Sequence, residues 1–156
     1  MEIFTVSLFG HRYLADLRKL TDRLFPMIKE LMQTKPYVSF LIGRNGEFDE
    51  DAASVIKHAQ KELGKENNDI TLVLPYAVAR LAYYEKYYDN IVIPERLYGV
   101  HPKSAITLKN RWMVDMSDLV IAYVERTNGG AYEALKYAEK RNKKIINIAT
   151  VVAPEQ

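Results

Sequence analysis

The chain has 156 residues, of which 48% are apolar and 27% charged, a balance typical of a folded globular domain rather than a disordered or fibrous chain. Its 22 basic and 20 acidic residues leave a net charge of +2, which disfavours nucleic acid as a partner held by bulk attraction. The absence of cysteine excludes disulfides, thiol nucleophiles and thiolate metal sites. We expect one domain over residues 1–156 in the cytoplasm, because residues 1–9 lack a signal-peptide pattern and no apolar run is long enough to cross a membrane.

Short runs of β-branched and aromatic residues alternate with helical patterns along the whole chain. The expected strands cover residues 3–9, 37–42, 70–74, 90–93, 119–124 and 144–148. The expected helices cover residues 14–33, 50–63, 78–88, 104–116 and 130–140, with Asp49 and Ser104 as N-caps of the second and fourth. Strands that are apolar on both faces are typical of parallel sheets. The sequence therefore predicts an α/β, Rossmann-like three-layer sandwich with a mostly parallel sheet of about six strands.

Three loops follow expected strands and reach the edge of the sheet where such folds bind ligands. In the first, Gly10-His11-Arg12, glycine allows a tight turn or a close approach to a ligand, and arginine suits a phosphate. A simple turn with two solvated side chains is the open alternative. In the second loop we favour ligand contact for Gly43, Arg44 and Gly46. Asp49 then either caps the following helix or faces the pocket, and Glu47 is left undecided between ligand and solvent.

The third loop, Asn128-Gly129-Gly130, leads into a helix whose free N–H groups suit a phosphate or a sugar. Paired glycines are also common in turns that bind nothing, so both interpretations stay open. Glu133 falls in the first turn of this helix, where it either points at a bound sugar or closes a capping box. We expect Gly10, Gly43 and Gly129 to converge at one rim of the sheet around a sugar phosphate.

Two further features precede the third loop. Arg111, beside Trp112 on a helix, either stacks on the surface or turns into the cleft to hold a phosphate. Tyrosines gather over residues 83–88, and we favour packing against the sheet over stacking on a base. The histidines lack ligand-like spacing, so no metal site is predicted, and no cofactor motif such as G-x-G-x-x-G or a Walker A loop is present.

These motifs, in this order, resemble the SLOG superfamily, and within it the YpsA-like group. The matching segments are Gly10-His11-Arg12, Gly43-x-x-Gly46-x-x-Asp49, residues 110–115 and residues 128–133, which together span nearly the whole chain. The resemblance implies a Rossmann-like fold that binds nucleotides or molecules derived from them. It also places Gly129, Gly130 and Glu133 on part of the motif of LOG-type phosphoribohydrolases, and Arg111 on their helix arginine. The upstream Pro-Gly-Gly of that motif is replaced here by Glu125-Arg126-Thr127.

The first functional hypothesis is a binding or sensing domain for a nucleotide-like small molecule, with an ADP-ribose-like ligand as one candidate. The alternative is a LOG-like hydrolase that cleaves the N-glycosidic bond of a nucleoside monophosphate, with Glu133 and Arg111 as its catalytic residues. Binding of single-stranded DNA, as in the superfamily member DprA, is less favoured because no basic stripe is visible. A membrane partner is not expected, and a homo-oligomer is left open.

Overall fold

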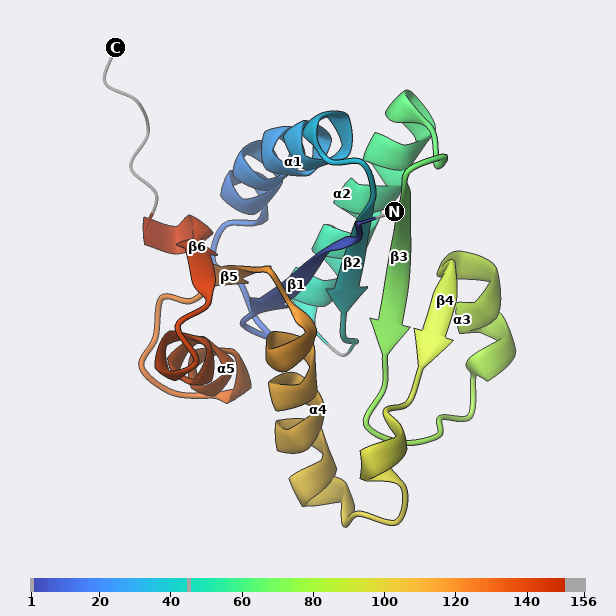
Figure 1. Cartoon of the computed structure of the whole chain (residues 1–156). Helices are drawn as coiled ribbons and strands as arrows, with labels where there is room; N and C mark the ends of the chain where they lie inside the picture. Colours follow the sequence, from blue (N-terminus) through green and yellow to red (C-terminus); the bar gives the residue numbers. More distant parts are fainter. Residues whose placement is uncertain (1, 45, 151–156) are drawn as a thin grey trace.

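A six-stranded sheet with helices on both faces makes up the computed structural model, which describes residues 2–44 and 46–150 (Figure 1). Met1, Asn45 and residues 151–156 lie outside the described residues. The strands are β1 Phe4–Gly10, β2 Val38–Ile42, β3 Asn68–Val73, β4 Asn90–Val92, β5 Leu119–Tyr123 and β6 Lys144–Asn147. The helices are α1 Leu17–Thr34, α2 Glu47–Leu63, α3 Leu81–Tyr87, α4 Pro102–Met116 and α5 Gly130–Lys140, with short 3-10 turns at Glu95–Leu97 and Ile148–Thr150.

The strand order across the sheet is β4-β3-β2-β1-β5-β6, and all five neighbouring pairs are parallel. This confirms the predicted α/β, Rossmann-like class. The chain winds outward from β1 through β2, β3 and β4, and then returns to the other side of β1 with β5 and β6. The winding therefore reverses between β1 and β5, which is the position where open α/β sheets bind their ligands.

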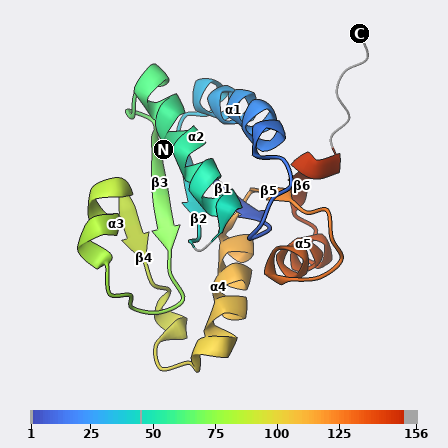
Figure 2. The ribbon, with the colours of Figure 1, turned by 180° about the vertical axis from the view of Figure 1, so that it is seen from behind.

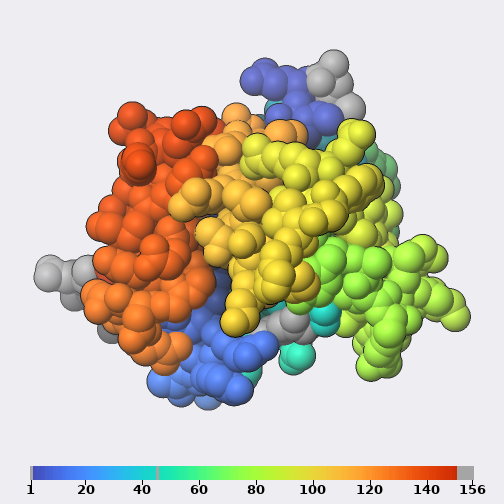
Figure 3. All heavy atoms as spheres, turned by 90° about the horizontal axis from the view of Figure 1, so that it is seen from below, coloured from blue at the N-terminus to red at the C-terminus, as the bar shows by residue number. Residues whose placement is uncertain are grey.

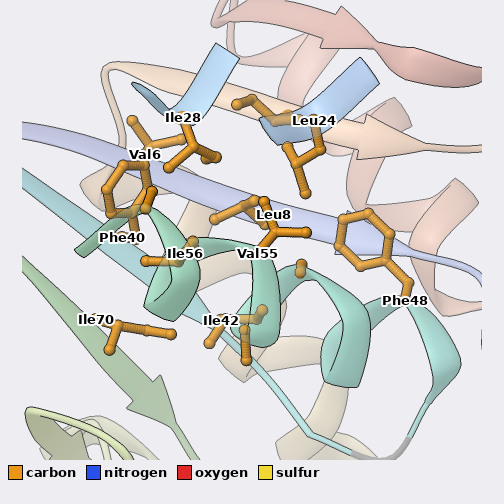
Figure 4. Packing of buried hydrophobic residues seen from close by; sticks show 14 of the residues in the cluster. Val6, Leu8, Leu24, Ile28, Phe40, Ile42, Phe48, Val55, Ile56 and Ile70 are labelled. Carbon is orange, nitrogen blue, oxygen red and sulfur yellow. The ribbon is translucent and has the colours of Figure 1, made fainter. Parts of the chain in front are cut away.

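Side chains that alternate along β1 supply both layers of the core. Val6 and Leu8 pack beneath α1 and α2, whereas Phe9 packs beneath α4 and α5 on the opposite face (Figures 1 and 2). Figure 4 shows the first of these clusters, in which side chains from β1, β2, α1 and α2 point toward one another. Ser7 also faces the α4 side, and its hydroxyl donates to the carbonyl oxygen of Met113 at 2.9 Å. Both faces of β1 are thus fixed, and its carboxyl end is held rigidly at the rim.

Four helix starts differ from the sequence-based expectation, and one of them is that of α3, which begins at Leu81 rather than at residue 78. α1 begins at Leu17 rather than at residue 14, because Asp16 accepts a hydrogen bond from the backbone N–H of Lys19 and serves as its N-cap. α2 begins at Glu47 with Gly46 as N-cap, so the prediction that Asp49 is the N-cap is wrong. His101, not Ser104, caps α4, through a hydrogen bond that its side chain accepts from the N–H of Lys103.

Candidate functional site

A cavity of about 380 Å³ opens at the rim where β1, β2 and β5 end. Its wall comes from the loops after these three strands, from the end of β3 and the segment that follows it, from α4 and from the start of α5. Gly10, Gly43 and Gly129, which are far apart in the chain, all line it, as the sequence predicted. Figure 3 looks onto this rim, where the blue β1–α1 segment, the golden helix α4 and the orange β5–α5 segment meet. A volume of this size falls within the usual range for small-molecule sites.

The cavity brings together the ten residues that the sequence analysis favoured for ligand binding: Gly10, His11, Arg12, Gly43, Arg44, Gly46, Asp49, Asn128, Gly129 and Gly130. It also includes residues that sequence reasoning did not select: Leu8, Phe9, Val73, Pro75, Tyr76, Ile106, Lys109, Asn110, Arg126 and Ala131. Lys109, Asn110 and Arg126 are the members of this second group with a charged or amide side chain. The sequence analysis selected Arg111 on this helix, but its two preceding neighbours, Lys109 and Asn110, line the cavity instead.

Gly10 is a glycine because α2 packs directly on it. A Cβ atom at this position would lie less than 3.0 Å from three carbon atoms of Phe48, a side chain that is fully buried. This close approach lets the first turn of α2 reach the end of β1. The glycine therefore positions the second loop of the cavity beside the first, whether or not a ligand also touches its backbone.

His11 joins the first loop to the third. Its imidazole is buried, and Nε2 accepts hydrogen bonds from the backbone N–H groups of Glu125, at 2.8 Å, and Arg126, at 3.2 Å. An acceptor Nε2 requires a neutral ring with its proton on Nδ1. Burial, with a further contribution from Arg126, lowers the pKa of His11 and favours this neutral form. The side chain is thus a structural clamp on the rim of the cavity.

Glu47 joins the first loop to the second. Its carboxylate accepts a hydrogen bond from the backbone N–H of Leu14 at 2.8 Å, and its own N–H donates to the carbonyl oxygen of Arg12 at the same distance. A Cβ on Gly46 would lie 3.0 Å from the Cα of Arg12, so the two loops are in close contact. The role left undecided for Glu47 is therefore structural, since the carboxylate holds the loop that carries Arg12.

Asp49 and Lys109 are two ionisable residues of the cavity lining whose pKa values are both shifted by desolvation. Desolvation raises the pKa of Asp49 to about 6, although the positive charge of Lys109 opposes the shift. Desolvation likewise lowers the pKa of Lys109, whose side chain is buried. A Cβ on Gly43 would lie 2.8 Å from Nζ of Lys109 and 3.5 Å from Oδ2 of Asp49. Gly43 thus leaves room for a lysine that the sequence pattern alone would place on the solvent side of its helix.

The N-terminus of α5 also opens on the cavity. Gly129 is its N-cap, with φ of +92°, a conformation that side chains other than glycine rarely adopt. Glycine has no side chain with which to cap the helix, so the first N–H groups remain available to an anion. The first turn of α2 carries three carboxylates, Glu47, Asp49 and Glu50, whose charges already complement that helix dipole, whereas the first turn of α5 carries one, Glu133. We therefore consider α5 the better of the two helix ends for a negatively charged group.

Among the described residues, the cavity lining holds four cationic side chains, Arg12, Arg44, Lys109 and Arg126, against one carboxylate, Asp49. His11 adds no charge in its neutral form. The positive excess at this rim contrasts with the near balance of the whole chain. An anionic ligand with hydroxyl or amino groups matches such a lining, because the cations attract its charge and the carboxylate accepts its hydrogen bonds.

Arg111 and Glu133, the two proposed catalytic residues, do not belong to this lining. Arg111 is exposed, and its guanidinium lies 5.2 Å from the ring centre of Tyr137 rather than on Trp112. The hydroxyl of Tyr137 in turn donates to Asp115 at 2.9 Å, so Arg111 is part of a surface cluster on α4 and α5. Glu133 is exposed on α5.

Residues 2–44 and 46–150 contain no group of three or more histidine, aspartate or glutamate side chains placed to hold a metal ion. Within the same residues, no helix combines the length and the apolar character needed to cross a membrane.

Neither a protein-family model nor a curated protein matches the chain. Solved structures do. DNA processing protein A (DprA) from Streptococcus pneumoniae superposes with a TM-score of 0.66 at 14% identity, over 92% of this chain and 49% of that protein. The molybdenum cofactor binding protein of Rippkaea orientalis superposes with a TM-score of 0.62 at 18% identity, over 93% of this chain and 76% of that protein.

DprA from Helicobacter pylori, whose structure describes single-stranded DNA binding, gives a TM-score of 0.63 at 14% identity, over 91% of this chain and 63% of that protein. The chain thus spans about half to two thirds of the length of the two DprA proteins. At these identities the likeness defines the fold. The chain has the Rossmann-like α/β fold that DprA shares with molybdenum cofactor binding proteins.

Proposed function

We propose that this protein binds a nucleotide, or a small molecule derived from one, in the cavity at the carboxyl ends of β1, β2 and β5. The protein acts as a binding or sensing domain. The observation that carries the proposal is the joint presence, in one cavity, of the open N-terminus of α5, four cations and a single carboxylate. The structural likeness to a molybdenum cofactor binding protein agrees with a small organic anion as ligand. Membership of the YpsA-like group is part of the same proposal.

Binding has more support than hydrolysis of an N-glycosidic bond. The hydrolase hypothesis needs Arg111 on the phosphate and Glu133 near the sugar, yet neither side chain lines the cavity. A catalytic group must come within hydrogen-bond reach of the reacting atoms. The DprA likeness keeps single-stranded DNA as a partner to test, although the cations gather in one cavity instead of forming a track along which a strand could lie.

Calorimetric titration tests the proposal. The ligands are AMP, GMP, ADP-ribose and ribose 5-phosphate, beside a single-stranded oligonucleotide. We expect one of the small anions to bind, and to raise the unfolding temperature by linkage. Arg126→Gln removes a cation from the lining, so affinity should fall about tenfold through loss of a charge-assisted hydrogen bond. Binding of the oligonucleotide alone, with no response to any small anion, would contradict the proposal.

Arg111→Gln is the matched variant, since it makes the same change of charge outside the cavity. The proposal predicts that its affinity equals that of the wild type. An equal loss of affinity in Arg111→Gln, together with release of free base from AMP, would favour the hydrolase instead.

A further inference from the structure

A second cavity, of about 450 Å³, lies beside the first. Arg44 and Asp49 line both, so the two spaces meet at these side chains. The remaining wall of the second cavity is dominated by four tyrosines, Tyr83, Tyr84, Tyr87 and Tyr88. They come from α3 and its C-cap, which flank the edge strand β4 (Figure 1). We call this space the tyrosine cavity and the first one the glycine cavity.

The tyrosines divide into two pairs. Tyr87 and Tyr88 are half-buried and pack against the main hydrophobic cluster, as the sequence analysis favoured. Tyr83 has 56% of its surface exposed, and α3 buries none of its residues. The ring centres of Tyr83 and Tyr84 are 5.5 Å apart, and those of Tyr84 and Tyr88 are 6.2 Å apart, so the rings form one continuous aromatic wall. Packing of the core explains the inner pair but does not require the outer one.

Polar groups surround this wall in a way that suits a flat heterocycle. The guanidinium of Arg44 lies 6.0 Å from the ring centre of Tyr84, and that of Arg80 lies 4.8 Å from that of Tyr83. Sites for nucleobases combine aromatic rings on which the base stacks with cation–π contributions from arginine. The carboxylates of Asp49 and Glu50 also line the tyrosine cavity, where they can accept hydrogen bonds from ring amino groups.

We propose that the tyrosine cavity is the subsite for the base of the ligand, with Tyr84 as its main stacking surface, while the phosphate lies in the glycine cavity and the sugar lies between them beside Arg44 and Asp49. This inference rests on the proposed function and narrows it: the ligand carries an amino-substituted aromatic base in addition to its phosphate. In this arrangement α3 recognises the base of the ligand, and the loops after β1, β2 and β5 bind its phosphate.

The test compares ligands that differ only by the base, with calorimetric titration of AMP, GMP and ribose 5-phosphate against the intact protein. Because stacking of a base on an aromatic side chain strengthens binding substantially, we expect the better nucleotide to bind at least tenfold more tightly than ribose 5-phosphate. Tyr84→Leu keeps an apolar side chain but removes the ring. It should abolish most of the advantage of the nucleotide and leave the affinity for ribose 5-phosphate unchanged.

Tyr98→Leu is the matched control, because Tyr98 is 68% exposed and belongs to neither cavity lining. It should bind both ligands like the wild type. Retained binding of ribose 5-phosphate by Tyr84→Leu shows that the variant is folded.

The failures are distinguishable. If nucleotides bind no better than ribose 5-phosphate, or if their advantage survives Tyr84→Leu, the base subsite is refuted and the proposed function stands. Loss of the advantage in Tyr76→Leu instead would place the base in the glycine cavity and refute the inference in the same way. If none of AMP, GMP, ADP-ribose and ribose 5-phosphate binds, both the subsite and the proposed function are refuted.

Discussion

The ring of Phe48 occupies the space into which a side chain on Gly10 would project. Phe48 belongs to the first turn of α2, and Gly10 is the last residue of β1. Their contact seats the loop that carries Arg44 and Gly46 against the loop that carries Arg12. The shape of the glycine cavity therefore depends on a packing contact made beneath it.

Gly10→Ala should destabilise the protein strongly, because the added methyl group must displace the buried ring of Phe48. Overpacking of this kind costs about 1–3 kcal/mol, and we expect the upper end here since the ring is fully enclosed. Chemical denaturation measures the change in the free energy of unfolding. A loss below about 0.5 kcal/mol would show that α2 does not pack on β1 as described.

The strands and their parallel arrangement could be predicted because their residues are apolar on both faces, a pattern that depends only on local sequence. Convergence of Gly10, Gly43 and Gly129 followed from the general rule for such sheets. Lys109 could not be found in this way, because a lysine on an amphipathic helix normally faces solvent. Its burial depends on the absence of a side chain at Gly43, which follows β2. The contact between this glycine and the lysine of α4 becomes visible only in three dimensions.

The role of His11 was equally hidden. The sequence indicated a ligand contact or a solvated side chain, but the imidazole accepts hydrogen bonds from a loop more than 100 residues away. Asp49 was predicted as a helix cap because it precedes the apolar pattern of α2. The helix starts about one turn earlier, at Glu47 with Gly46 as its N-cap, and the side chain of Asp49 lines the cavity.

The clamp formed by His11 makes stability depend on pH. Its pKa is lowered in the folded protein, so the unfolded chain binds the proton more readily than the folded one does. The contribution of His11 is therefore complete above the unfolded pKa of about 6.5, and it is lost as pH falls through the lower folded value. We expect the contribution of His11 to the free energy of unfolding to decline between pH 7 and pH 5. The difference in the free energy of unfolding between the wild type and His11→Gln should therefore shrink over this range, and a difference that does not change with pH would contradict the clamp.

Asp49 acts in the opposite direction. Its pKa is raised to about 6 by desolvation, so its negative charge is unfavourable above pH 6 and is relieved as pH falls toward the unfolded value. Asp49→Asn should accordingly raise the free energy of unfolding at pH 8, by about 1 kcal/mol or more. The gain should shrink at pH 5, where the wild-type carboxyl is largely protonated. Thermal or urea unfolding at the two pH values measures both effects.

Glu50→Gln serves as the control for Asp49→Asn, because it removes an exposed carboxylate from the same turn. Its effect should stay within about 0.5 kcal/mol at either pH. A gain in the free energy of unfolding as large as that of Asp49→Asn would mean that removal of any negative charge from this turn stabilises the protein, whether or not the charge is desolvated.

Binding of a nucleotide in the glycine cavity is tested most directly at Gly130. A Cβ here meets only Asn110, at 3.9 Å, so Gly130→Ala fits the fold and adds a methyl group to the cavity lining at the start of α5. Calorimetric titration of the wild type and this variant with AMP and ADP-ribose is the decisive measurement. Tight binding by the wild type, weakened about tenfold in Gly130→Ala with no loss of unfolding temperature, is the predicted result. Equal affinity of the two proteins for the nucleotides, or no binding of either nucleotide to the wild type, would contradict this prediction.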